Sequence, residues 1–169
     1  LKETIIAESK EEWTKNIIET TLNEVTDKRA VLIICETKKN ADKLFNELTT
    51  RYRVEGRKGR VIAYTRNDNN ENRAVESRLH SGDIVVATNL AGRGTDIKTT
   101  TEVEDAGGLH LCVTFLADNL RVEQQAFGRT ARQGQKGSAQ LIINKDKLGN
   151  EYLGADNIKT IREIRNDLE

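Results

Sequence analysis

Short apolar runs alternate with amphipathic segments along most of this chain. Each run is bounded by polar residues, as is typical of strands that are covered on both faces of a sheet. We expect strands at residues 31–35, 61–64, 83–87, 109–114 and 139–143. The remaining pattern favours helices at about 9–26, 37–48, up to about 79, 119–128, and from about 156 onward.

Two of these helices have specific signals. Apolar side chains recur at helical spacing from Trp13 to Val25. Thr37 stands where an N-cap residue is expected, directly before an amphipathic stretch. The basic, glycine-containing residues 51–60 that follow are predicted to form a loop.

The order of these elements predicts an α/β fold with a mostly parallel sheet and helices on both faces. In such folds the functional residues lie in loops beyond the carboxyl ends of the strands. Two loops have an unusual composition, 88–98 after the third strand and 128–137 before the fifth. We expect both of them at that edge of the sheet.

Composition narrows the classes of function. The 169 residues include 27 Lys and Arg against 27 Asp and Glu, so the formal net charge is zero. A domain that binds duplex DNA through its phosphates usually carries an excess of positive charge, so the zero net charge argues against that function. No apolar run approaches the roughly 20 residues of a membrane span.

Cys35 and Cys112 lie within apolar runs and are expected to be reduced core residues. The chain contains no Met, so we expect it to be a piece of a longer protein.

The loop after the third strand lies in the stretch Ala-Thr-Asn-Leu-Ala-Gly-Arg-Gly-Thr-Asp-Ile, residues 87–97. Its glycines let the backbone approach a ligand closely. The guanidinium of Arg93 suits a phosphate or a carboxylate, and Asp96 can accept hydrogen bonds from ribose hydroxyls or pair with a cation. An ordinary turn, with Asp96 capping a helix and Arg93 in solvent, explains the stretch equally well.

A second stretch, Gln-Gln-Ala-Phe-Gly-Arg-Thr-Ala-Arg-Gln-Gly at 124–134, places Arg129 and Arg132 three residues apart at a helix end. At that spacing both side chains point the same way, and two guanidiniums form a clamp for a triphosphate. Most arginine pairs at helix ends bind no ligand, and instead face solvent or offset the helix dipole. A chance occurrence of both stretches in one chain is much rarer than a chance occurrence of either one.

The two stretches resemble motifs V and VI of the superfamily 2 motor ATPases. More narrowly, Asn89, the Gly-Gly-Leu-His at 107–110 and the order of residues 121–134 resemble the SecA-type preprotein translocase ATPases. The resemblance covers residues 28–145. It implies the second, C-terminal RecA-like domain of such a motor, a three-layer αβα helicase C-terminal domain.

The resemblance also implies roles for single residues. In that family ATP lies with Mg²⁺ in a cleft between two RecA-like domains, and the first domain supplies the phosphate loop and the Mg²⁺ carboxylates. Asp96 matches the acidic residue that approaches the ribose. Arg93 and Gly94 belong to the same motif at the domain interface.

Motif VI supplies the remaining implied roles. Arg129 and Arg132 match the arginines that reach the γ-phosphate, with Arg132 as the arginine finger. Gln125 and Gly128 match the residues that link hydrolysis to domain closure.

The chain departs from the bacterial SecA pattern at Ala131, at Phe127 and at residues 64–68, so it resembles a divergent relative. It also lacks the G-x-x-x-x-G-K-[ST] phosphate loop, because the stretch at 56–59 has neither the spacing nor the hydroxyl residue. We therefore expect half of a composite site and no ATPase activity from this chain alone. His80 and His110 are expected to be surface or core residues rather than metal ligands.

These observations lead to one main hypothesis and two alternatives. We expect an N-terminal helix at 1–27, the RecA-like domain at 28–145 and a helical extension at 146–169. The domain would couple ATP hydrolysis to polypeptide translocation in the cytoplasm or at the periphery of a membrane. Its partners would be the first RecA-like domain, an unfolded polypeptide and, as a further candidate, a membrane channel.

The alternatives are the equivalent domain of an RNA or DNA helicase, and a non-catalytic interaction module with the same fold. The zero net charge argues against nucleic acid as the partner. So does the basic stretch at 51–60, which has a single aromatic residue, Tyr52.

Overall fold

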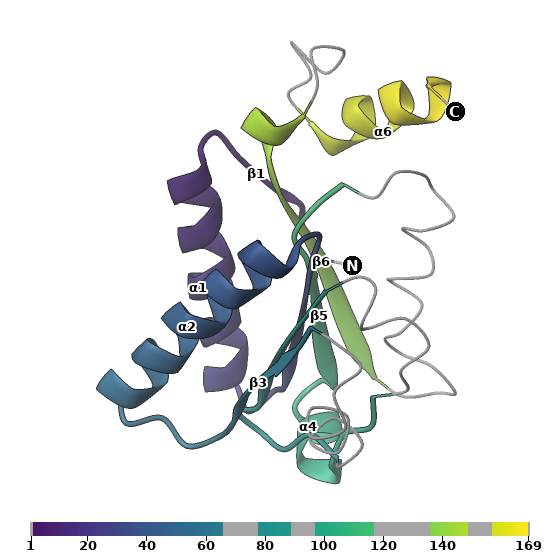
Figure 1. Cartoon of the computed structure of the whole chain (residues 1–169). Helices are drawn as coiled ribbons and strands as arrows, with labels where there is room; N and C mark the ends of the chain where they lie inside the picture. The colour runs from purple at the N-terminus through teal and green to yellow at the C-terminus, as the bar shows by residue number, and fades with distance from the viewer. Residues whose placement is uncertain (1, 66–77, 89–96, 117–135, 149–156, 169) are drawn as a thin grey trace.

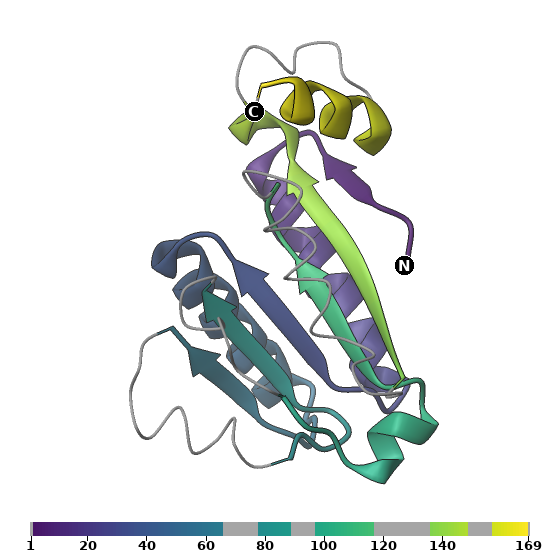
Figure 2. The same cartoon turned by 90° about the vertical axis from the view of Figure 1, so that its right-hand side faces the viewer.

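The computed structural model describes residues 2–65, 78–88, 97–116, 136–148 and 157–168. They form a six-stranded sheet in the order β1-β6-β5-β2-β4-β3, in which every pairing is parallel (Figures 1 and 2). The strands are β1 (Ile5–Ala7), β2 (Val31–Cys35), β3 (Val61–Tyr64), β4 (Ile84–Thr88), β5 (Leu109–Val113) and β6 (Gly137–Asn144). The α/β class and the parallel sheet are therefore confirmed.

The helices of the described residues are α1 (Lys10–Thr26), α2 (Lys38–Val54), α4 (Thr101–Asp105), α6 (Ile158–Asp167) and a short 3₁₀ turn, η2 (Lys145–Lys147). Side-chain caps define where the long helices begin. The Ser9 hydroxyl accepts from the Glu12 amide at 3.2 Å, and the predicted cap Thr37 accepts from the Asn40 amide at 3.2 Å. None of these helices is long and apolar enough to cross a membrane.

Two hydrophobic cores, one on each face of the sheet, explain the continuous apolar runs. On β2, Ile33 and Cys35 face α1 and α2 and pack in the same core as Trp13. Leu32 and Ile34 face the opposite side, in the core that also holds Val103 of α4 and Ile161 of α6. All five residues of β2 are buried, so every position of that strand must be apolar. Helices on both faces of the sheet are thus confirmed.

The structure corrects several element boundaries. The sequence analysis missed β1, a three-residue edge strand whose Ile5 pairs with Ile142 of β6. It missed α4, and it ended the second helix too early, because α2 continues to Val54. The aromatic ring of Tyr52 holds this last turn of α2 against the sheet, since it is buried and its hydroxyl donates to the Gly82 carbonyl. The helix predicted to end near residue 79 falls mostly on residues 66–77, outside the described residues, but Leu79 itself lies in a bridge with Thr99 and not in a helix. The helix predicted at 119–128 lies outside the described residues.

Candidate functional site

The site residues predicted from sequence all belong to two segments outside the described residues. Arg93, Gly94 and Asp96 lie in residues 89–96. Gln125, Gly128, Arg129 and Arg132 lie in residues 117–135. The structure does describe the residues on either side of each segment, and these show how the segments are attached to the sheet.

The segment 89–96 begins at the carboxyl edge of the sheet. Thr88, the last residue of β4, pairs with Cys35 of β2, so the segment follows directly from a fully buried strand. The expectation for the loop at 88–98 is therefore confirmed for its first residue, Thr88, whereas Lys98 lies beside Leu79, which precedes the amino end of β4. The next described residues, Ile97 and Lys98, lead to Thr99, which pairs with Leu79 in an isolated bridge.

The segment 117–135 follows β5, and hydrogen bonds fix the strand at that point. The amide and hydroxyl of Thr114 both donate to the Ile34 carbonyl, at 3.1 and 2.8 Å. The indole of Trp13 donates to the carbonyls of Thr114 and Ile142, each at 3.1 Å. The beginning of α1 is therefore tied to both β5 and β6 at the carboxyl edge.

The residues that follow this segment, 136 and 137, lie at the opposite edge of the sheet, which corrects the expectation for the end of the loop at 128–137. Gly137 pairs with Leu109, the first residue of β5, and Lys136 contacts Gly108 just before it. Residues 136 and 137 thus lie at the amino edge. The cause is topological, because residues that join two parallel strands must return from the carboxyl edge to the amino edge.

One carboxylate connects the ends of the two segments. Glu104 of α4 accepts a hydrogen bond from the Lys136 amide at 2.9 Å through Oε2. Its Oε1 accepts from the Thr99 hydroxyl at 3.0 Å. The short helix α4, which the sequence did not reveal, therefore holds both segments where they rejoin the described structure.

The Gly-Gly-Leu-His stretch at 107–110 has a structural explanation. The guanidinium of Arg29 donates to the carbonyls of Gly107, Gly108 and Leu109 at 3.2, 2.9 and 3.3 Å, and it pairs with Glu24 at 3.2 Å. Gly108 has φ +83°, and a Cβ at this position would lie 1.9 Å from the Lys136 carbonyl oxygen. Gly107 is favoured by its φ of +119°, which L side chains rarely adopt, and Gly108 is needed both for its positive φ and for the close approach of the Lys136 backbone.

The buried charges around Arg29 affect the titration of their neighbours. Burial lowers the pKa of His110 to about 4, although the Glu24 carboxylate opposes this shift. Burial acts to raise the pKa of Glu24, but the hydrogen bond from Lys2 and the nearby positive charges leave it below its ordinary value. His110 Nδ1 lies 2.7 Å from the Ser138 hydroxyl, so this histidine is a neutral core residue, as the sequence analysis expected.

The candidate metal ligands and the thiols of the described residues are easily surveyed. No group of three His, Cys, Asp or Glu residues there could hold a metal ion. Cys35 and Cys112 are free and buried, as expected. Burial raises the pKa of Cys35 to about 12 and raises that of Cys112 further, so neither thiol is a nucleophile at neutral pH.

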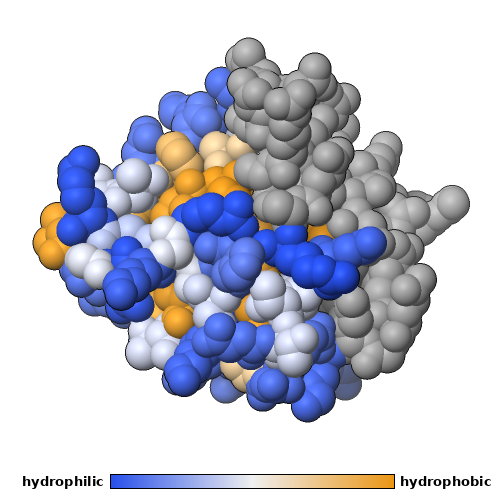
Figure 3. All heavy atoms as spheres, turned by 90° about the horizontal axis from the view of Figure 1, so that it is seen from below, coloured by the Kyte–Doolittle hydropathy of each residue, from blue (hydrophilic) through white to orange (hydrophobic). Residues whose placement is uncertain are grey.

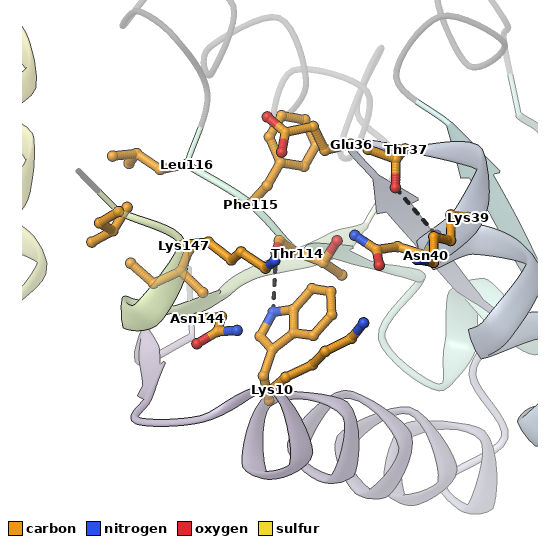
Figure 4. A pocket seen from close by; sticks show the side chains of 13 residues that line it. Lys10, Glu36, Thr37, Lys39, Asn40, Thr114, Phe115, Leu116, Asn144 and Lys147 are labelled. Carbon is orange, nitrogen blue, oxygen red and sulfur yellow. Dashed lines mark hydrogen bonds between the residues drawn. The ribbon is translucent and has the colours of Figure 1, made fainter.

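A pocket of about 310 Å³ opens at the carboxyl edge, between the first turns of α1 and α2 and the end of β6. We call it the edge pocket. Its charged and amide side chains are those of Lys10, Glu36, Lys39, Asn40, Asn144 and Lys147, which Figure 4 shows around one space together with Thr37 and Thr114. Trp13, Phe115 and Leu116 contribute its apolar part. Sequence reasoning missed these residues because they come from four separate elements.

The described surface has no extended apolar face. Figure 3 views the side of α4 and the amino edge, where hydrophilic residues dominate and apolar atoms show only between them. Among the described large apolar residues, only Val54 and Leu168 are strongly exposed, at 75 % and 61 %. The polar edges of the sheet are thus the better candidates for function.

Comparison with known sequences identifies close relatives of part of this chain. It is 46 % identical over 93 residues to protein translocase subunit SecA 3 of Magnetococcus marinus, and 41 % identical over 97 residues to SecA 2 of Nitrosospira multiformis. These matches cover 54 % and 57 % of this chain. They span only 14 % of each relative, so the chain corresponds to a small part of those proteins.

Comparison with solved structures confirms the fold. Domain 2 of the DEAD-box helicase Mss116p, bound to an RNA duplex, matches 86 % of this chain and 56 % of its own with a TM-score of 0.62 at 20 % identity. The E. coli DEAD-box protein SrmB, bound to the regulator RraA, matches 85 % of this chain and 79 % of its own with a TM-score of 0.59 at 20 % identity. At this identity the likeness concerns the RecA-like fold alone.

A family model matches about three quarters of the chain. The family described as the helicase conserved C-terminal domain matches residues 9–134, which include both segments of predicted site residues. Together with the parallel sheet and the SecA relatives, this shows that the chain belongs to the family of helicase conserved C-terminal domains.

Proposed function

We propose that this chain is the second RecA-like half of a SecA-type motor, which couples ATP hydrolysis to the movement of a polypeptide. The observation that carries the proposal is the 46 % identity to a protein translocase subunit within a helicase C-terminal fold. The partners would be the first RecA-like domain, an unfolded polypeptide and a membrane channel. The motor would work in the cytoplasm or at the membrane surface.

In this proposal the chain contributes one wall of an ATP site. Asp96 contacts the ribose, with Arg93 and Gly94 beside it, and Arg129 and Arg132 contact the terminal phosphate. Gln125 and Gly128 transmit hydrolysis to domain closure. The donor set fits the ligand, because guanidiniums complement phosphate oxygens and a carboxylate complements ribose hydroxyls. Mg²⁺, held by the first domain, would neutralise charge on the phosphates.

The described structure supports this proposal through the attachment of the two segments. Asp96 lies three residues before Thr99, and Arg132 lies four residues before Lys136. Both attachment points bind the carboxylate of Glu104. One side chain at the amino edge thus fixes where the chain re-enters the described structure after each segment.

The test is stimulation of ATP hydrolysis in the full-length protein. A polypeptide motor should hydrolyse ATP faster when an unfolded polypeptide is added, and RNA should have no effect. Stimulation by RNA and not by polypeptide would instead favour the second candidate, a nucleic-acid helicase domain. That candidate rests on the fold likeness to an RNA-bound DEAD-box domain.

A further inference from the structure

The edge pocket has a marked excess of positive charge. Three lysines, Lys10, Lys39 and Lys147, line it together with one carboxylate, that of Glu36. None of these lysines forms an ion pair with another described residue, whereas Lys2 and Lys38 elsewhere do. The pocket therefore gathers cationic groups whose charge is not offset within the described part of the chain.

A buried hydrogen-bond donor at the pocket lacks an acceptor. Asn144, at the carboxyl end of β6, is only 5 % exposed. Its Oδ1 accepts from the Asp146 amide at 3.1 Å, which fixes the orientation of the side-chain amide. Its Nδ2 has no partner among the described residues. Buried polar groups are nearly always paired, so this donor points to a ligand that accepts a hydrogen bond.

The first turn of α2 adds a third favourable feature. This helix of 17 residues has no acidic side chain in its first turn, unlike α1 and α4. No acidic side chain of the first turn therefore offsets its N-terminal partial positive charge, and the one carboxylate that lines the pocket is that of Glu36, directly before the N-cap. Lys39 and Asn40 of this turn line the pocket, and Figure 4 shows Asn40, Asn144 and Lys147 directed toward the same space.

We propose that the edge pocket binds a phosphate group. Phosphate oxygens accept hydrogen bonds from amides and attract lysine ammoniums. The volume of about 310 Å³ exceeds what one phosphate needs, and Phe115 and Leu116 offer an apolar wall for the remainder of a small phosphate ester. None of the lining residues belongs to the segments that carry the predicted ATP contacts, so this inference does not depend on the proposed function.

The experiment uses the single tryptophan as a reporter. Trp13 lines the pocket and is the only tryptophan in the chain, so its indole N–H gives one identifiable NMR signal. The ¹⁵N-labelled chain is titrated with inorganic phosphate and with adenosine monophosphate, against chloride at matched ionic strength. Saturable shifts with either phosphate compound, absent with chloride, are expected. Equal affinities for inorganic phosphate and adenosine monophosphate would indicate that the pocket recognises the phosphate group alone. Tighter binding of adenosine monophosphate would indicate that the apolar wall contacts the rest of the ester.

Variants assign the binding to the pocket. Asn144→Asp keeps the shape and the Oδ1 acceptor but replaces the unpaired donor by a negative charge, and should weaken binding by about tenfold or more. Lys147→Gln, at an exposed position where folding is not at risk, should weaken it a few-fold. Lys58→Gln removes the same charge from an exposed site near Gly82 at the amino edge and should leave binding unchanged.

Three results would overturn the proposal. One is a response to chloride equal to that with phosphate. Another is unchanged phosphate binding in both Asn144→Asp and Lys147→Gln. The third is a shift with single-stranded RNA but with neither small phosphate compound, because the pocket would then belong to a polymer-binding surface.

Discussion

The carboxylate of Glu104 accepts a hydrogen bond from the backbone amide of Lys136, at 2.9 Å between Oε2 and the nitrogen. Its second oxygen accepts from the Thr99 hydroxyl at 3.0 Å. A short helix of five residues thereby joins Thr99 and Lys136, which follow the two segments that carry the predicted ATP contacts. Because catalysis depends on how accurately groups are positioned, this single side chain should influence turnover without touching the nucleotide.

Glu104→Ala should lower the kcat of the full-length ATPase by roughly 10-fold to 100-fold, as expected when catalytic groups shift by about an ångström. KM for ATP should change less, and Glu104→Gln should recover part of the rate because its amide oxygen can replace one acceptor. Glu102→Ala on the same helix, at an exposed position, is the matched control. The Lys136 amide should also exchange faster with solvent in Glu104→Ala; unchanged exchange together with unchanged kcat would contradict the positioning role.

Arg132→Ala in the full-length protein should nearly abolish ATP hydrolysis and leave nucleotide affinity almost intact. An arginine finger stabilises the charge that develops on the transferred phosphoryl group, and supplying one is worth roughly 10³–10⁵ in rate. Arg132→Lys should restore little, because an ammonium lacks the planar fork. Steady-state turnover and nucleotide binding are measured side by side. If Arg132→Ala hydrolysed ATP at a rate close to that of the parent, Arg132 would not be the arginine finger. Arg129 would then be tested as the finger in the same way.

Asp96→Ala should have the opposite effect and weaken nucleotide affinity more than it lowers kcat. A ribose contact is made equally before and during the reaction, so its loss removes uniform binding. Asp96→Asn, which keeps an acceptor, should lie between the parent and Asp96→Ala. A fall in kcat at constant affinity would show that Asp96 acts on the chemical step instead.

Gly108→Ala should destabilise the isolated chain more than Gly56→Ala. Both glycines have positive φ, +83° and +62°, so both substitutions incur backbone strain of about 1–3 kcal/mol. At Gly56 nothing lies within 4 Å of the added Cβ, whereas at Gly108 it would meet the Lys136 carbonyl oxygen at 1.9 Å. Urea denaturation measures the difference. Equal losses for the two variants would mean that the contact with Lys136 does not constrain this position.

Acidification should destabilise the fold through His110. Its pKa in the folded chain is about 4 against 6.5 for the free group, so the unfolded state binds the proton first as the pH falls. Stability is therefore complete above about pH 6.5 and declines between 6.5 and 4, by at most about 3 kcal/mol for this group. Glu24, whose pKa is lowered, adds a loss in the same direction at lower pH. Urea denaturation of His110→Gln should show a flatter dependence between pH 6.5 and 4, and a slope equal to that of the parent would refute the assignment.

Local patterns were sufficient for the elements that carry their own signal. The apolar run of β2 predicted a strand buried on both faces, and Thr37 predicted the beginning of α2. The three-residue strand β1 was missed because so short a run acquires its structure from pairing with β6. The end of α2 was misjudged because Tyr52 stabilises it through a distant carbonyl, that of Gly82.

The sequence by itself determined the class of fold, since periodicity is a property of neighbouring residues, and its resemblance to a motor family supplied the candidate nucleotide contacts. Only the tertiary structure decided that Glu104 joins Thr99 to Lys136, that Arg29 binds the carbonyls of Gly107 and Gly108, and that Lys10, Asn40 and Asn144 share a pocket. In each case the partners are set by the order of parallel strands, which brings together residues far apart in the chain. Such contacts leave no local pattern, because hydrogen bonding and charge depend on distance in space and not on separation in sequence.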